Sequence, residues 1–220
     1  MDNKDHVIKL DDVWFSYSRE RPVLSATNLV LHRGERAALL GSNGSGKSTL
    51  FHIIMGLIKP EKGKVTILGK ERQQGRDFFE VRQKVGLLFQ DSDDQLFCPT
   101  VAEDIAFGPL NLGKSREEAR DIVKKTLEVL GLEGFDERIT YKLSEGEKRL
   151  VALGTVLAME PEVLLLDEPT TGLDKEHTRR FFDIIKSSAR SYIIITHDPD
   201  LIEQSTTKQF AIKDGRVYKR

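Results

Sequence analysis

The octapeptide GSNGSGKS, residues Gly41–Ser48, is the most informative stretch of this 220-residue sequence. It fits the pattern G-x-x-x-x-G-K-[ST], which lies between a strand and a helix in phosphate-binding loops. The preceding Ala37–Leu40 is a short apolar run, typical of a buried parallel strand. We expect a helix over Lys47–Leu57 after it. A glycine-rich turn with a surface lysine is the alternative, and the flanking strand and helix argue against it.

The residue types in this loop match the chemistry of a nucleoside triphosphate. Glycines let backbone N–H groups curl around phosphate oxygens, and the helix N-terminus adds positive potential. Lys47 is expected to reach the β- and γ-phosphates, Ser48 to offer its hydroxyl to Mg²⁺, and Thr49 to bond the α-phosphate. The loop residues predicted to contact the nucleotide are Gly41, Ser42, Asn43, Gly44, Ser45, Gly46, Lys47, Ser48 and Thr49.

Two acids follow a second apolar run, Val163–Leu166. They stand at the carboxyl end of a predicted strand, where α/β sheets place their sites. Asp167 is predicted to be the Mg²⁺ partner, and Glu168 to polarise an attacking water. Kinases of the same loop class often lack the second acid, so Glu168 favours hydrolysis over phosphoryl transfer to a substrate. The alternative is a pair of solvent-exposed carboxylates at a strand end.

Bulk composition is that of a soluble globular protein. Lys and Arg (34) nearly balance Asp and Glu (35), so no overall field attracts nucleic acid or an anionic membrane surface. The N-terminus lacks the features of a signal peptide, and the apolar runs fall far short of the roughly 20 residues of a membrane helix. The single cysteine, Cys98, excludes an intramolecular disulfide and a cysteine metal cluster. A reducing cytoplasm is the simplest compartment.

Strands and helices alternate along the chain, which predicts an α/β fold with a mostly parallel sheet. Further strands are predicted at His6–Phe15, Ala26–Leu31, Lys64–Leu68, Val85–Phe89 and Tyr192–Thr196, a helix at Lys175–Ser188, and a final hairpin turning at Asp214-Gly215. The block from Pro99 to Ala158 is predicted to be helical and inserted into this sheet. Its three capping boxes are Thr100/Glu103, Ser115/Glu118 and Ser144/Glu147, and the middle helix is expected to close on Gly131.

These motifs, in this order, resemble the ATP-binding cassette (ABC) ATPases over nearly the whole chain. LSEGE, residues 143–147, stands where the family's signature motif belongs, and Thr171–Asp174 resembles its D-loop. Gln90 resembles the Q-loop glutamine, His197 the switch histidine, and Tyr17 the aromatic that stacks on adenine. Trp14 and Phe15 lie close to Tyr17, so packing on an aromatic-rich edge strand is the alternative for all three.

The resemblance implies a P-loop NTPase (RecA-like) core with a mostly parallel sheet, an N-terminal antiparallel β subdomain and an inserted α-helical subdomain. In this single 1–220 domain, 1–90 and 160–220 are the expected core and 91–159 the helical subdomain with the signature motif. ATP and Mg²⁺ are the implied cofactors. The implied catalytic residues are Lys47, Gln90, Glu168 and His197; the implied metal residues are Ser48, Gln90 and Asp167; Tyr17, Ser144, Gly146 and Asp174 join the loop residues in binding nucleotide.

Members of this family work as head-to-tail dimers, with two ATP molecules between the loop of one subunit and the signature helix of the other. The resemblance therefore implies a second ABC ATPase subunit, identical or different, and closure that depends on ATP. The chain ends directly after the hairpin, so we expect a monomer or weak dimer until ATP and a membrane partner are present.

A finer resemblance lies in FQDSDDQLFCPTVAEDIAFGPLNLG, residues 89–113, which is similar to ATPases of energy-coupling-factor importers, particularly the cobalt/nickel branch. It implies an importer for cobalt/nickel or another micronutrient. It also implies that residues 91–113 are the surface on which integral membrane subunits dock. The chain would then be a peripheral protein on the cytoplasmic face of the cell membrane. Packing of this segment on its own core is the alternative. A soluble ABC ATPase acting on ribosomes or nucleic acid is the competing function, which the lack of a basic stripe disfavours. A P-loop small-molecule kinase is a third.

The signature segment departs from the family's usual L-S-G-G-Q at two positions. Glu147 replaces glutamine, and Glu145 replaces a glycine near the expected position of a partner's γ-phosphate. Lys148 and Arg149 follow and can offset the added charge. We expect Glu145 to point away from the nucleotide and to leave a working but less avid site.

Overall fold

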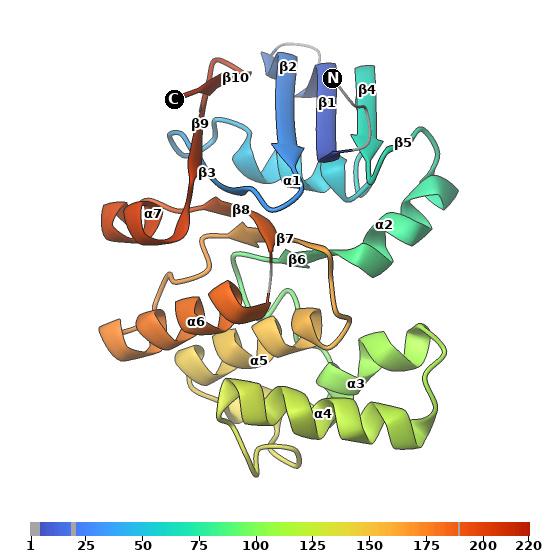
Figure 1. Cartoon of the computed structure of the whole chain (residues 1–220), viewed down its shortest axis with the longest axis vertical. Helices are drawn as coiled ribbons and strands as arrows, with labels where there is room; N and C mark the ends of the chain where they lie inside the picture. The colour runs from blue at the N-terminus through green and yellow to red at the C-terminus, as the bar shows by residue number, and fades with distance from the viewer. Residues whose placement is uncertain (1–4, 19–20, 189) are drawn as a thin grey trace.

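Four strands form an antiparallel sheet at one end of the molecule (Figure 1). The computed structural model describes residues 5–18, 21–188 and 190–220. The sheet has the order β2-β1-β4-β5, and its strands are β1 (His6–Ser18), β2 (Arg21–His32), β4 (Lys62–Ile67) and β5 (Lys70–Glu71). β2 begins five residues before the predicted Ala26, because it pairs with β1 along most of its length.

A six-stranded sheet forms the centre of the fold, in the order β10-β9-β3-β8-β7-β6. Its strands are β3 (Arg36–Leu40), β6 (Val85–Leu88), β7 (Val163–Asp167), β8 (Ser191–Ile195), β9 (Lys208–Lys213) and β10 (Arg216–Lys219). All its pairs are parallel except β9–β10, the predicted hairpin. Asp214 and Gly215 both have positive φ, as the predicted two-residue turn requires. The predicted α/β fold with a mostly parallel sheet is confirmed.

Helices lie on both sides of the central sheet (Figure 1). They are α1 (Lys47–Ile54), α2 (Phe78–Lys84), α3 (Val101–Asn111), α4 (Arg116–Leu130), α5 (Glu145–Leu157), α6 (Lys175–Ser188) and α7 (Pro199–Ser205), with 3₁₀ turns at Gly75–Asp77 and Thr140–Lys142. All three predicted capping boxes are formed, at the starts of α3, α4 and α5. α4 ends at Gly131 in the left-handed conformation, as predicted. No helix in the described part of the chain is long and apolar enough to cross a membrane.

α1 ends at Ile54, three residues before the predicted Leu57, for a steric reason. Gly56 has a φ of 65°, and a Cβ there would lie 2.2 Å from the ring of Phe78. The chain therefore turns at Gly56 and brings Phe78, the first residue of α2, against it. The sequence pattern did not predict α2 or α7, since seven residues are too few to show a helical period.

The hydrophobic core is divided into two clusters by the central sheet. Strands β7 and β8 send alternate residues to opposite faces, as strand geometry dictates. One face packs against α1 and the antiparallel sheet, and its residues are Val163, Leu165, Ile193 and Ile195. The other packs against α3, α4, α5 and α6, and its residues are Leu164, Leu166, Tyr192 and Ile194. Burial on both faces explains why these strands read as continuous apolar runs.

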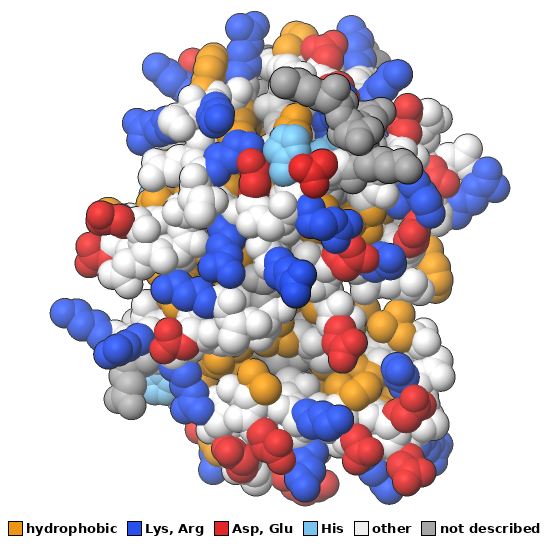
Figure 2. Space-filling view, in the orientation of Figure 1, with side chains coloured by type: hydrophobic (Ala, Val, Ile, Leu, Met, Phe, Trp, Pro, Cys, Tyr) orange, Lys and Arg blue, Asp and Glu red, His pale blue; other side chains and the backbone are white. Residues whose placement is uncertain are grey.

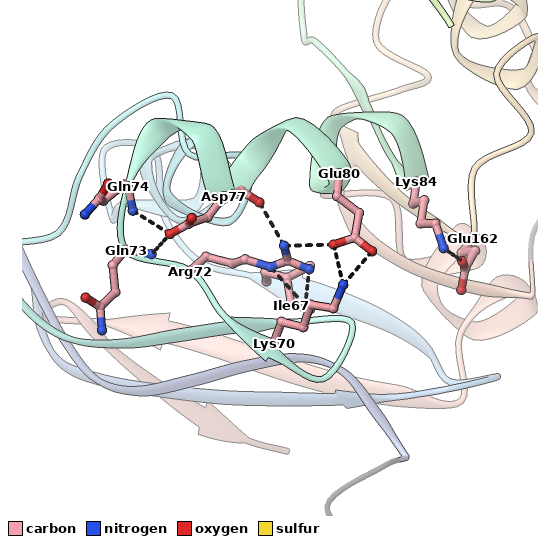
Figure 3. Close-up of polar contacts among 9 residues, drawn as sticks. All are labelled: Ile67, Lys70, Arg72, Gln73, Gln74, Asp77, Glu80, Lys84 and Glu162. Atoms are coloured by element: carbon pink, nitrogen blue, oxygen red, sulfur yellow. Dashed lines mark hydrogen bonds and ion pairs between the residues drawn. The ribbon is translucent and has the colours of Figure 1, made fainter.

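A buried arginine fixes α2 to the antiparallel sheet (Figure 3). Arg72 donates to the carbonyl of Ile67 from Nε (3.3 Å) and Nη2 (3.1 Å). Its Nη1 donates to the carbonyl of Asp77 (2.8 Å) and to the carboxylate of Glu80 (3.0 Å), which Lys70 also pairs. α2 leads directly into β6, so these contacts set where that edge strand begins.

Changing Arg72→Lys should lower the free energy of unfolding by about 1–3 kcal/mol, because a lysine cannot reach all of these buried acceptors. Urea denaturation followed by circular dichroism measures it. A change below about 0.5 kcal/mol contradicts the importance of this contact.

Candidate functional site

A cavity of about 790 Å³ gathers most of the predicted site residues. Its lining includes Tyr17, Asn43, Gly44, Gly46, Lys47, Ser48, Thr49, Gln90, Asp167, Glu168 and His197, together with Val23 and Thr171. Most of its lining residues stand at or just after the carboxyl ends of β3, β6, β7 and β8, which are neighbouring parallel strands. Their carboxyl ends therefore meet at one edge of the sheet, where α/β folds bind ligands.

The conformation and packing of the glycine-rich loop exclude side chains at several of its positions. Gly44 and Gly46 have φ values of 74° and 102°, in the left-handed region that glycine adopts without cost. A Cβ on Gly46 would lie 3.1 Å from Val23 and Leu24 of β2. A Cβ on Gly41 would lie 2.7 Å from Ile212 of β9. The loop is thus pressed against two strands and presents its open side to the cavity.

Lys47 lies across this loop, although it is the first residue of α1. Its side chain is buried, and Nζ donates to the carbonyls of Gly41 (2.8 Å) and Ser42 (3.1 Å). The Ser45 hydroxyl is also buried and has no hydrogen-bond partner among the described residues. A buried ammonium, an unpaired hydroxyl and a helix N-terminus fit a polyphosphate.

The two predicted acids stand at the carboxyl end of β7. Asp167 is the last residue of the strand and is buried. Glu168 has a φ of 43°, and its N–H donates to the carbonyl of Ile195 at 2.9 Å. Its Oε1 lies 3.3 Å from Nε2 of His197, which follows β8. Burial raises the pKa of Glu168, and the charges of His197 and Lys47 offset part of this effect.

Tyr17 stands at the rim of the cavity and is 66% exposed. Its hydroxyl lies 3.2 Å from that of Thr49, and its ring meets Phe15 edge to face, with centroids 4.8 Å apart. Trp14 is not in the cavity lining, and its indole N–H donates to Asp12. Of the three neighbouring aromatics, Tyr17 is therefore the one positioned to contact a ligand.

Three predicted nucleotide contacts lie away from this cavity. The lining, taken over the described residues, does not include Ser144, Gly146 or Asp174; Gly41, Ser42 and Ser45 are also absent from it, but they belong to the phosphate loop itself. Ser144 caps α5, where its hydroxyl and N–H each donate to Glu147 at 2.8 Å. Asp174 accepts from the N–H of His177 at 2.8 Å, at the start of α6. These residues lie on the surface of the same chain, apart from its own phosphate loop.

Sequence reasoning missed two polar residues of α5 and its neighbourhood that hold the site in place. Arg149 is 1% exposed and donates to the carbonyls of Phe89 (2.5 Å), Gln90 (3.1 Å), Asp167 (3.0 Å), Glu168 (3.0 Å) and Pro169 (2.7 Å). Gln95 accepts from the N–H of Phe89 at 3.2 Å and donates to the carbonyl of Ala152 at 3.1 Å. Arg149 follows Lys148 in a charged stretch, so nothing in the pattern showed that it is buried.

The loop, its lysine and the acids of the adjacent strand define a P-loop NTPase. Comparison with known proteins makes this class more specific. Residues 24–171 match the family described as ABC transporter. A protein of Nitratidesulfovibrio vulgaris, provisionally named an ABC transporter ATP-binding protein, is 48% identical over 96% of this chain and 78% of its own length. The energy-coupling factor transporter ATP-binding protein EcfA of Methanocaldococcus jannaschii is 42% identical over 97% of this chain and 78% of its own.

The solved structures agree. The structure of cbiO1 from Clostridium perfringens, described as part of the ABC transporter complex cbiONQ, has a TM-score of 0.86 and 36% identity. The match covers 97% of this chain and 87% of that one. The chain belongs to the ABC transporter family. It is an ATP-binding transporter subunit, which binds ATP with Mg²⁺ and hydrolyses it.

Changing Gly46→Ala should weaken ATP binding by at least about tenfold, because the new Cβ meets β2 and the left-handed φ is lost from the loop. Equilibrium titration with a fluorescent ATP analogue measures this change. Gly113→Ala is the matched control, since Gly113 also has a positive φ (87°) but no atom within 4 Å of the new Cβ. Equal losses of affinity in both variants contradict the specific role of the loop.

Proposed function

We propose that this chain is the ATPase of an energy-coupling-factor importer that carries cobalt/nickel ions or another micronutrient. The observation that carries the proposal is a cavity for ATP connected, through the segment after Gln90, to an apolar groove on the helical layer. The similarity to EcfA and cbiO1 supports the importer class. The cobalt/nickel cargo rests on the sequence of residues 89–113.

Within the cavity, the phosphate loop and Lys47 bind and orient the triphosphate. The N–H groups of the loop and the start of α1 face it, and Tyr17 stacks on the base. Ser48, Gln90 and Asp167 would hold Mg²⁺, which would neutralise charge on the phosphate oxygens. Positioning and electrostatic stabilisation are most of what phosphoryl transfer requires from a protein.

Glu168 is the proposed general base. Its carboxylate accepts the proton of the attacking water, and its partial burial favours this role because a raised pKa makes it a stronger base. His197, 3.3 Å away, holds the Glu168 carboxylate and stands beside the γ-phosphate position. Both side chains are aimed by backbone at the ends of buried strands, so little reorientation is needed on binding.

A second copy or a related ATPase completes each site. Ser144, Gly146 and Asp174 lie outside the cavity of their own chain, which fits a role toward the nucleotide of a partner. The structure places Glu145 beside Gly172 of its own chain, with Glu145 Cγ 3.5 Å from where a Gly172 Cβ would be.

The helical layer carries the proposed docking surface for membrane subunits. We assign residues 1–90 and 160–220 to the nucleotide-binding core and 91–159 to a helical subdomain. A groove of about 1060 Å³ runs between α3 and α4, with an apolar floor that includes Ala106, Leu110 and Val123. Phe97 (66% exposed) and Phe107 (48% exposed) form an edge-to-face pair beside it. An exposed apolar groove of this kind fits an amphipathic helix of a partner.

Charges of both signs line the groove, including Glu103 of α3 and Glu128 of α4. Arg116, Arg120 and Lys124 line it from α4, and Glu133, Asp136 and Glu137 line it from the loop after α4. Elsewhere, the face in Figure 2 shows acidic and basic side chains interspersed, without a basic patch suited to nucleic acid. Docking at this groove places the chain on the cytoplasmic face of the cell membrane as a peripheral subunit.

The groove is mechanically connected to the ATP site. Asp104 of α3 accepts from the N–H groups of Phe97 (3.1 Å) and Cys98 (3.0 Å). These residues end the segment that starts at Gln90, and Gln95 in its middle is bonded to α5. A displacement of Gln90 is thereby passed to the residues that line the groove.

Changing Glu168→Gln should lower kcat by about 10²–10³-fold and leave ATP binding intact, because the amide cannot accept the proton. ATP should then trap a dimer, detectable by size-exclusion chromatography with light scattering. Glu203→Gln on α7 is the control for loss of one carboxylate, and its rate should not change.

The pH dependence of hydrolysis provides a second measurement on the same residue. Because the base must be ionised, the rate falls as pH falls through the pKa of Glu168. Burial raises that pKa, so the acid limb should lie above the ordinary value of 4.5. Hydrolysis by Glu168→Gln within about twofold of the parental rate contradicts the assignment.

Changing Phe107→Asp should abolish co-purification with a small integral membrane protein, because a carboxylate at the edge of the groove opposes apolar packing. Affinity purification from detergent-solubilised membranes, followed by mass spectrometry, measures this. Tyr218→Asp is the control, since Tyr218 is similarly exposed (51%) but lies on β10. ATP binding should be the same in both variants.

Cellular accumulation of cobalt and nickel tests the cargo. Cells that carry the native transporter genes with Glu168→Gln in this chain should lose uptake of the metal. Parental uptake of both metals in these cells contradicts the cargo assignment and leaves the ATPase assignment untouched.

A further inference from the structure

Arg149 is a cation buried in the core, and its five hydrogen bonds within the described part of the chain all go to backbone carbonyls rather than to a carboxylate. A guanidinium has five N–H donors in a rigid planar arrangement, so the number of bonds equals its capacity. Burial lowers the pKa of Arg149 to about 10, which still leaves it charged at neutral pH. A buried charge needs compensation of this kind, so the five carbonyls and the guanidinium hold one another in place.

The five carbonyls belong to the two chain segments that carry the proposed catalytic side chains. Asp167 ends β7, Glu168 and Pro169 follow it directly, and Phe89 and Gln90 follow β6. Glu168 has a left-handed backbone, which non-glycine residues adopt only when their surroundings enforce it. Arg149 binds the carbonyl on each side of this residue as well as its own. The hydrogen bonds from Arg149 to these three carbonyls therefore help to enforce the left-handed backbone of Glu168.

Phe89 is held from both sides by groups bonded to α5. Its carbonyl accepts from Arg149, and its N–H donates to Gln95, whose amide donates in turn to Ala152 and to Thr155 of α5 (3.0 Å). α5 begins at Glu145, directly after its cap Ser144, so Arg149 lies in the second turn of the proposed signature helix.

We infer that Arg149 is a positioning residue that fixes the directions of Glu168 and Gln90 relative to the Ser144 turn. Glu168, which acts on the subunit's own ATP, and the Ser144 turn, which faces the partner's ATP, are then held rigidly relative to each other. This inference rests on the proposed function, which supplies the roles of Glu168, Gln90 and Ser144. A lysine cannot replace the guanidinium, because its ammonium is a point charge that cannot reach five acceptors at once.

The test is steady-state hydrolysis by the full chain with Arg149→Lys, which preserves charge and helix propensity. We expect kcat to fall about 10- to 100-fold, because displacement of catalytic groups by about 1 Å costs this much. The affinity for a non-hydrolysable ATP analogue should stay within about threefold, since the phosphate loop is untouched. Thermal unfolding with and without the analogue checks that the variant is folded.

Arg72→Lys is the matched control. Arg72 is also a buried arginine that donates to backbone carbonyls, but it lies at α2, away from the cavity. A purely structural role for Arg149 predicts that both variants lose stability and that neither changes kcat per folded molecule. That result overturns the inference.

Two further variants keep the outcomes separable. If Arg149→Lys does not fold, Gln95→Ala decides, because it frees Phe89 while leaving Arg149 in place. A severalfold fall in kcat with unchanged analogue affinity supports the inference, and a parental kcat overturns it. Glu168→Gln tests the proposed function independently. Parental hydrolysis by Glu168→Gln removes the proposed function itself, whereas a loss there with no loss in Arg149→Lys removes only the positioning role.

Discussion

The parallel pairing of β3, β8, β7 and β6 is the constraint on which the rest of the structure depends. Leu166 of β7 stands opposite Ile194 of β8 on one side and Leu88 of β6 on the other. Because the strands are parallel and in register, the chain leaves all of them at the same edge. The phosphate loop, Gln90, Glu168 and His197 therefore come together without any contact of their own being needed. Apolar burial on both faces of the sheet positions the polar site.

The helical layer is joined to this edge by polar contacts set in apolar surroundings. Leu150 and Val151 pack α5 into the core, and Arg149 beside them carries its charge into that core. An apolar residue there would pack well but would leave the carbonyls of the Glu168 turn unpaired, which is costly when buried. Leu150 and Val151 pack the helix against the sheet, and the hydrogen bonds of Arg149 orient the Glu168 turn. Stability and geometry thus come from neighbouring residues of one helix.

The sequence predicts the elements whose chemistry is local. The phosphate loop needs glycine at fixed positions, the three helix starts need capping boxes, and the Asp214-Gly215 turn needs positive φ, so each leaves a readable pattern. The positions of Lys47, Gln90, Asp167, Glu168 and His197 around one cavity follow from motifs at strand ends. Arg149, Gln95 and Arg72 could not be found in this way. Arg149 donates to backbone carbonyls far away in the chain, and the amide of Gln95 reaches α5 more than 50 residues away. The backbone acceptors of Arg72 are nearer, but backbone groups have no residue type to recognise.

The acidic start of α5 acquires a physical meaning from its hydrogen bonds. The Ser144 hydroxyl has one proton, and here it donates it to Glu147 at 2.8 Å. Hydrogen bonds from Ser144 lower the pKa of Glu147, so this acceptor is ionised at neutral pH, and Arg138 pairs it at 3.2 Å. A hydroxyl that serves a partner's phosphate must first leave this carboxylate, and a charged acceptor holds it more strongly than the amide of a glutamine. Lys148 and Arg149 are the residues predicted to offset the negative charge of Glu145. Lys148 already pairs with Asp93 at 2.6 Å, and Arg149 is buried, so each positive charge also serves another contact. In the proposed dimer, the cap and the partner's phosphate compete for the same proton, so Glu147 is a second reason to expect a less avid site.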